Sequence, residues 1–112
     1  MSRVYLVVNS DLEMSAGKIA AQVGHAVQHI FEYYIDHVDK QSDLIKYQQT
    51  GNTKIVLKAS HDKIIALYRK YPNKSFLIID AGRTEIEPGS VTVLGFLPMS
   101  EPLKELKSLS LL

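Results

Sequence analysis

The chain has 112 residues, 46% of them hydrophobic, and this length fits one domain, residues 1–112, that buries a core without disulfide or metal staples. Its 13 basic and 12 acidic residues leave a net charge of +1, which excludes strong general attraction to nucleic acid or membranes, so a polyanionic partner must be held by a local patch. Because there is no cysteine and the histidines show no paired motif, we expect no metal site and no cofactor. No apolar run is long enough to span a membrane and no signal peptide is recognisable, so we expect a cytoplasmic protein.

The N-terminal third predicts a strand followed by a long helix. Residues 4–8 are a continuous run of β-formers, typical of a central strand covered on both faces. Ser15 is placed to cap the helix, whose apolar residues recur at spacings of three and four and form one stripe. That stripe comprises Ile19, Val23, Val27, Ile30, Phe31, Tyr34 and Val38.

The middle of the chain predicts a helix, a strand and another helix. Residues 42–51 are typical of a short helix ended by Gly51, and residues 53–59 alternate as a strand does. Ser60 then caps a helix that Pro72 ends.

The C-terminal part predicts two strands and a short helix. Residues 75–80 and 91–97 are apolar strands, joined by a loop in which Pro88 and Gly89 suit the middle of a type II turn. Residues 100–102 open a last helix with three leucines on one side, namely Leu103, Leu106 and Leu109.

This order of elements favours an α/β fold with helices on both faces of a four-stranded sheet. Helical connections favour parallel pairing of the first three strands with right-handed crossovers, whereas the loop between the last two strands allows them to be antiparallel. We therefore expect a mixed sheet.

A polar stripe on the long helix is the first candidate site. At 100° per residue, three side chains of this helix fall within roughly 40° of Lys18, namely Gln22, His25 and His29. Lys18 lies nearest the helix start, where backbone N–H groups and Gly17 favour an anion. The pattern predicts a phosphate or a developing oxyanion beside Lys18, although an exposed lysine in a first turn costs only about 0.3 to 1 kcal/mol and is common.

Residues after the third strand form the second candidate site, because ligands of open α/β sheets bind at the carboxyl ends of strands. Asp80 either caps the following turn or acts in catalysis. Arg83 either binds a ligand or forms a surface ion pair with a nearby glutamate.

For three further residues, ordinary structural roles compete with functional ones. His25 has no metal-ligand spacing and is as well explained by solvation or a hydrogen bond. Thr84 and Thr92 suit turn and strand positions by propensity alone.

Three segments of the sequence resemble the type-two peptidyl-tRNA hydrolases, the archaeal and eukaryotic kind. They are SDLEMSAGKIAAQVGHAV (10–27), KIVLKA (54–59) and DAGRTEIEPGSVTVLG (80–95). The resemblance implies a three-layer α/β/α sandwich with a mixed four-stranded sheet, in a fold that often dimerises, so a homodimer stays open. It also implies hydrolysis of the ester that joins a peptide to the 3′ ribose of tRNA.

The same resemblance assigns residues to the site. It implies Lys18, Asp80 and Thr84 at the active site, with His25 beside them and Thr92 from the second long motif. It places Gln22 and Lys58 near the cleft. Candidates for contacts with tRNA phosphates are Lys18, Lys54, Lys58 and Arg83, together with the helix start at Gly17.

Three departures from the family pattern lower the affinity for tRNA that the resemblance leads us to expect. Asn9, Glu13 and Ala16 stand where relatives commonly carry basic residues, which predicts weaker tRNA affinity and a shallower salt dependence. Two alternatives stay open: a noncatalytic adaptor that binds tRNA or protein, and a small-anion sensor on the same fold. The sequence also leaves open whether Lys18 acts on the oxyanion or on a phosphate.

Overall fold

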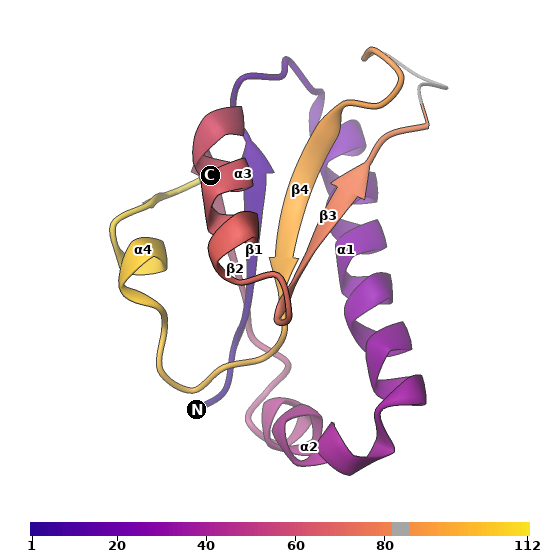
Figure 1. Ribbon diagram of the computed structural model, residues 1–112, viewed down its shortest axis with the longest axis vertical. Coiled ribbons are helices and arrows are strands. Elements are labelled where there is room, and N and C mark those ends of the chain that lie inside the picture. Colours follow the sequence, from indigo (N-terminus) through magenta and orange to yellow (C-terminus); the bar gives the residue numbers. More distant parts are fainter. Residues whose placement is uncertain (82–85) are drawn as a thin grey trace.

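The computed structural model describes residues 1–81 and 86–112, and its sheet has five strands in the order β3-β4-β1-β2-β5 (Figure 1). The strands are β1 (Val4–Asn9), β2 (Lys54–Ala59), β3 (Ser75–Ile79), β4 (Val91–Phe96) and β5 (Ser110–Leu111). The central β1 pairs in parallel with β2 and antiparallel with β4, and β4 pairs antiparallel with β3. The predicted α/β class and the mixed sheet are confirmed, as are the parallel pairing of β1 with β2 and the antiparallel pairing of β3 with β4. The predicted parallel pairing of the third strand is wrong, because β4 lies between β1 and β3.

The predicted number of four strands is wrong, because the chain ends in a fifth strand. β5 pairs antiparallel with β2, with Leu111 opposite Leu57. The leucine spacing predicts a helix up to Leu109, but α4 spans only Lys104–Lys107 and the chain then extends. A strand of two residues is too short for alternation to reveal it.

The other helical segments are α1 (Ala16–Asp36), a 3₁₀ turn (Val38–Lys40), α2 (Gln41–Gln49) and α3 (His61–Lys70). Both predicted serine caps are confirmed: the Ser15 hydroxyl accepts the Lys18 N–H at 3.2 Å, and the Ser60 hydroxyl accepts the Lys63 N–H at 3.2 Å. The predicted type II turn is supported by a φ of 83° at Gly89. Within the part of the chain that the structure describes, no helix combines the length and apolar character needed to cross a membrane.

The buried face of α1 differs from the predicted apolar stripe. The row that packs deepest on the sheet consists of Lys18, Gln22, Ala26, Ile30 and Tyr34. Most of the predicted stripe is only partly buried, and Val38 lies beyond the helix and is 69% exposed. The buried face of α1 is therefore rotated by about one residue relative to the predicted stripe. This rotation places Lys18 and Gln22 against the sheet.

Two hydrophobic clusters hold the helices to the sheet. Leu6 and Val8 of β1 belong to a cluster with α1 and α2, whereas Tyr5 and Val7 belong to a cluster with α3 and α4. Side chains of a strand alternate between faces, so β1 contributes to both clusters. Figure 1 shows α1 and α3 on either side of β4 and β1.

Gly95 allows α1 to approach β4 closely. A Cβ atom at residue 95 would lie 3.3 Å from the Ala26 Cβ, tighter than ordinary van der Waals contact between carbons. This close approach lies one helical turn beyond Gln22, on the side of α1 that faces the sheet.

Candidate active site

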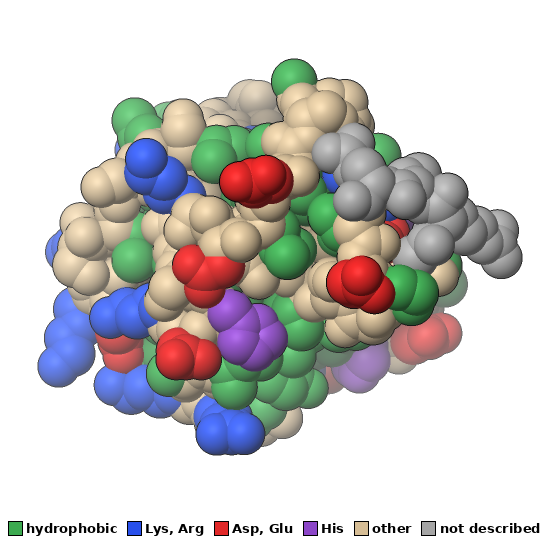
Figure 2. Space-filling view, turned by 90° about the horizontal axis from the view of Figure 1, so that it is seen from above, with side chains coloured by type: hydrophobic (Ala, Val, Ile, Leu, Met, Phe, Trp, Pro, Cys, Tyr) green, Lys and Arg blue, Asp and Glu red, His purple; other side chains and the backbone are tan. Residues whose placement is uncertain are grey.

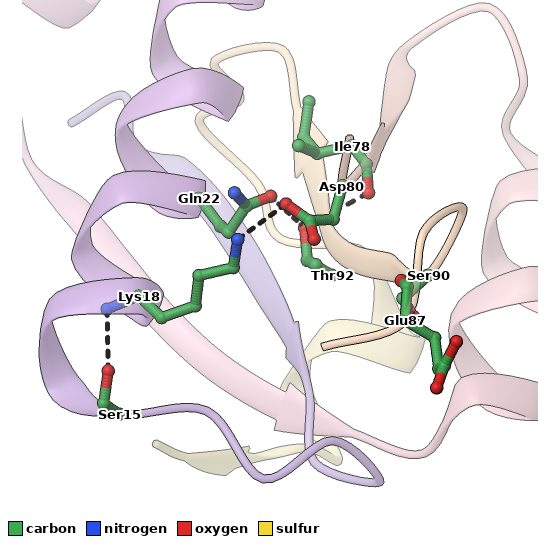
Figure 3. Close-up of polar contacts among 8 residues, drawn as sticks. All are labelled: Ser15, Lys18, Gln22, Ile78, Asp80, Glu87, Ser90 and Thr92. Carbon is green, nitrogen blue, oxygen red and sulfur yellow. Dashed lines mark hydrogen bonds and ion pairs between the residues drawn. The ribbon is translucent and has the colours of Figure 1, made fainter. Parts of the chain in front are cut away.

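A buried ion pair joins the first turn of α1 to the residue that follows β3. The Lys18 Nζ lies 2.6 Å from the Asp80 Oδ1, and their side chains are only 7% and 6% exposed. Figure 3 shows Lys18 reaching from the helix to Asp80. Residues 62 positions apart in the sequence, one from each candidate site, therefore meet in one small volume.

A β-bulge places a threonine beside this pair. Ile78 pairs with Val93 and Ile79 pairs with Val91, so Thr92 is the extra residue on β4. The Thr92 hydroxyl lies 2.6 Å from the Gln22 Oε1 and 3.2 Å from the Ile78 carbonyl oxygen. Bulges reorient side chains and are common next to active sites. Here the bulge directs Thr92 toward α1, where it fixes Gln22 one helical turn from Lys18.

Backbone bonds fix Asp80 at the end of the sheet. Its N–H donates to the Ser90 carbonyl at 2.9 Å, and its carbonyl accepts the Gly89 N–H at 3.0 Å. The turn before β4 closes through the Ser90 N–H, which donates to the Glu87 carbonyl at 3.2 Å. The carboxylate is therefore carried by sheet-like backbone rather than by a free loop.

Asn9 has a structural role at the same end of the sheet. It is buried, its amide donates to the Val91 carbonyl at 2.8 Å, and its Oδ1 accepts the Asp11 N–H at 2.9 Å. A basic side chain could not accept that second bond. Asn9 thus ties the loop after β1 to the start of β4.

The ion pair opens into a cleft of about 860 Å³ between α1 and β3. Its lining includes Lys18, Gln22, His25, Asp80 and, at the helix start, Gly17. His25 and Gly17 are exposed at the rim, whereas Gln22 is buried in the wall. The predicted polar stripe is thus divided between the wall and the rim of one cleft.

Two predicted lysines lie outside this lining. Lys54 opens β2 opposite Val4, at the other end of the sheet from Asp80, and its Nζ donates to the Asn52 carbonyl at 3.0 Å. Lys58 is exposed near the carboxyl end of β2, opposite Val8. Arg83 and Thr84 lie outside the described residues.

Acidic side chains flank the same end of the molecule. Asp11, Glu13 and Glu87 line a second hollow of about 520 Å³ between the loop after β1 and the loop before β4. Figure 2, which looks onto this end, shows acidic side chains across it and most of the lysines and arginines toward one side. Charge near the cleft is therefore less favourable to tRNA phosphates than the net charge of +1 suggests.

Some cleft residues are not predicted from the sequence as site residues. Ala21 is one of them, and it extends the α1 wall together with His29, which belongs to the predicted polar stripe. The opposite wall is β3 and its end, residues 77–81, of which only Asp80 is predicted. The β3 wall depends on the strand order, which no local pattern reveals.

Among residues 1–81 and 86–112, no three His, Cys, Asp or Glu side chains lie close enough together to hold a metal ion. The reactive groups of the described cleft are thus the Lys18 ammonium, the Asp80 carboxylate and the His25 and His29 imidazoles. This set can polarise a carbonyl, orient a water molecule and move a proton.

Comparison with known proteins decides the family. The sequence model of one protein family, described as peptidyl-tRNA hydrolase PTH2, matches residues 2–111 of this chain. The chain belongs to this family. A peptidyl-tRNA hydrolase of Saccharolobus islandicus is 41% identical over 109 residues, covering 92% of this chain and 91% of the relative.

Further relatives agree. The peptidyl-tRNA hydrolase of Saccharolobus solfataricus is 39% identical over 92% of this chain and 91% of its own length. That of Methanopyrus kandleri is 36% identical over 90% of this chain and 88% of its own. The family predicted from the three sequence motifs is confirmed, and with it the expected class of enzyme, a hydrolase of peptidyl-tRNA.

Proposed function

We propose that this PTH2 protein hydrolyses the ester of peptidyl-tRNA in the cleft between α1 and β3, with Lys18 and Asp80 as the reacting groups. The observation that carries the proposal is the buried pair of a cation and an anion, 2.6 Å apart, in a cleft open to substrate. An ester is more reactive than an amide, so a positioned water and a stabilised oxyanion suffice without a covalent intermediate.

Asp80 acts on the attacking water. Its carboxylate accepts a proton as the water oxygen bonds to the ester carbonyl carbon, and that proton then passes to the departing 3′ oxygen of the ribose. The products are a tRNA with a free 3′ hydroxyl and a peptide carboxylic acid, which releases the second proton of the water to solvent and becomes a carboxylate. General-base help of this kind contributes typically about 10² to 10⁴-fold.

Lys18 stabilises the oxyanion of the tetrahedral intermediate. An ammonium has three donors, and the one bonded to Asp80 leaves capacity for a second acceptor. The side chain is 7% exposed, so its charge acts through a medium in which electrostatic interactions are stronger than in water. Loss of one oxyanion donor costs about 10² to 10³-fold in rate.

The remaining predicted residues support this centre. Thr92 and Gln22 position the wall of the cleft through their 2.6 Å hydrogen bond. Gly17 and His25 at the rim contact the tRNA end, and Lys54, Lys58 and Arg83 stay proposed contacts to phosphates. Thr84 stays a proposed partner of Asp80.

We also infer that the two hydrophobic clusters separate three layers of one domain, in keeping with the family's expected α/β/α sandwich. A homodimer and a place in the cytoplasm, where translation occurs, belong to the same proposal.

The test is release of the acyl group from N-blocked aminoacyl-tRNA by the purified chain, in buffer with and without EDTA. We expect multiple turnovers in both. A folded protein that binds tRNA without releasing the acyl group would support the adaptor instead. A protein that neither cleaves nor binds tRNA but binds phosphate would support the anion sensor.

A further inference from the structure

The wall of the cleft that β3 provides is an open sheet edge. Among residues 1–81 and 86–112, β3 is terminal in the strand order and pairs only with β4. The sheet's other edge is β5, which has two residues, whereas β3 has five. Its sequence, SFLII, contains neither a charged residue nor proline, the usual protections of an edge strand. Ile79 is 53% exposed.

The backbone of β3 offers hydrogen-bonding groups to the cleft at alternate residues. On the β4 side, the Lys74 carbonyl accepts the Leu97 N–H at 3.0 Å, and the Asp80 N–H donates to the Ser90 carbonyl at 2.9 Å. In an antiparallel ladder, residues bonded to the neighbour alternate with residues whose N–H and C=O point the other way. Leu77 and Ile79 are of the second kind, and both line the cleft.

We propose, resting on the proposed function, that the peptide moiety of peptidyl-tRNA binds as an added strand on β3, bonding through its main chain to Leu77 and Ile79. Addition of a strand to an open edge gives affinity through main-chain hydrogen bonds that do not depend on side chains. This suits a hydrolase whose substrates carry peptides of any sequence.

The position of Asp80 fixes the direction of the added strand. Asp80 follows β3 directly, and the esterified carboxyl of the peptide must lie beside it. The peptide therefore extends from Asp80 back toward Ser75, and its direction from N to C terminus is that of β3. The added strand is parallel, so each outward residue of β3 bonds both ahead and behind.

The length of the wall limits how many peptide residues are held. Leu77 and Ile79 lie about 7 Å apart along the strand. That length accommodates two to three residues of peptide before the ester. Affinity for the peptide is therefore expected to rise with length up to about three residues and then to level off.

The experiment measures kcat/KM for tRNA carrying N-acetyl-aminoacyl, dipeptidyl, tripeptidyl and pentapeptidyl groups, all of alanine. We expect a rise of about fivefold for each residue that adds a hydrogen bond of ordinary strength, and no rise beyond three. Cleavage of the N-acetyl substrate tests the proposed function separately. If that substrate is cleaved at a rate that peptide length does not change, only the added strand is overturned.

Backbone methylation separates strand pairing from side-chain contact. In a tripeptidyl substrate, N-methylation of the amide that faces β3 should lower kcat/KM about fivefold or more, whereas methylation of the adjacent amide should have little effect. Equal effects at both amides, or none, would contradict the proposal.

The matching protein variants are Ile79→Pro, which removes one outward N–H, and Ile79→Ala, which keeps it. Edge strands accept proline where the N–H points away from the sheet. The ratio of tripeptidyl to N-acetyl activity should fall in Ile79→Pro and persist in Ile79→Ala. If a second copy of the chain occupies the edge instead, light scattering detects a dimer that Ile79→Pro dissociates. The ratio of tripeptidyl to N-acetyl activity is then one in the wild type and in both variants, which would overturn the proposal.

Discussion

Lys18 and Asp80 are both almost fully buried, so the charge of each side chain is stabilised by the opposite charge of the other. Removing one partner of such a pair leaves the other charge uncompensated in the interior. Lys18→Met and Asp80→Asn should each lower the free energy of unfolding by about 3 to 5 kcal/mol. The double variant should recover much of this loss without recovering activity. Urea denaturation of the four proteins checks this, and additive losses in the double variant would contradict it.

The Thr92 hydroxyl satisfies a buried carbonyl oxygen of Gln22. Thr92→Val keeps the shape but leaves that oxygen without its donor, which costs about 1 to 3 kcal/mol. Thr92→Ser keeps the hydroxyl and should lose less. Chemical denaturation of both variants checks the order, and a valine variant as stable as the serine variant would show that the bulge position tolerates an unpaired amide.

Local signals in the sequence predict some parts of the site and miss others. Ser15 and Asp80 stand out because a cap and the end of an apolar strand are recognisable within a few residues. The burial of Lys18 is not predictable in this way, because charge alone assigns it to the polar face of α1. Its burial is a tertiary property, because the Lys18 side chain packs against Asp80, 62 positions away in the sequence.

At the scale of elements, the strands were predictable where each has enough residues to show its pattern, and β5 was not. The order of strands was also beyond the sequence, because β4 inserts between β1 and β3 and leaves β3 at the edge. The bulge that exposes Thr92 to α1 likewise depends on how two strands pair. The connections between elements predict the strand directions and the fold class, whereas the order of neighbouring strands depends on tertiary packing.

The two serine caps provide a matched test of the helix that carries Lys18. Ser15→Ala and Ser60→Ala remove the same kind of bond, each at 3.2 Å, and each should cost about 1 kcal/mol of stability. Only Ser15→Ala loosens the turn bearing Lys18 and should lower kcat, because α3 lies outside the cleft. Thermal denaturation and turnover check both. Equal turnover of the two variants would contradict the link between the cap and the site.

A bond between α3 and α4 makes stability depend on acid pH. Glu105 Oε2 lies 2.6 Å from Lys70 Nζ, and this hydrogen bond is the main cause that lowers the pKa of Glu105 from 4.5 to about 2. A carboxylate whose pKa is lowered on folding stabilises the folded state at pH values above its ordinary pKa. For Glu105 this stability is lost as the pH falls from about 4.5 toward 2.

Glu105→Gln should therefore be less stable than the wild type at pH 6 and equal to it near pH 2. Urea midpoints across this range measure the difference. Glu101→Gln, which removes an exposed carboxylate nearby, serves as the control and should follow the wild type. A Glu105→Gln difference that stays constant down to pH 2 would contradict the assignment.

At the scale of the whole molecule, charge is arranged against tight tRNA binding. Acidic residues flank the cleft although the chain is slightly basic. Glu13→Lys should tighten tRNA binding and steepen the dependence of log Kd on log salt by about 0.7 to 0.9. Glu101→Lys makes the same change in net charge at a hollow beside the C-terminal end of α1 and should leave the slope unchanged. Filter binding at several salt concentrations compares them, and equal slopes would show that the acidic flank does not face the tRNA.

The central claim is that the pair of Lys18 and Asp80 is the centre of ester cleavage. Its most direct test is the single-turnover rate of N-blocked aminoacyl-tRNA cleavage by saturating wild-type and Asp80→Asn protein, with folding verified by circular dichroism. We expect the variant to bind the substrate and to cleave it at least about 10²-fold more slowly, because the carboxylate that takes the proton of water is gone. A folded Asp80→Asn protein that cleaves at the wild-type rate would contradict the account.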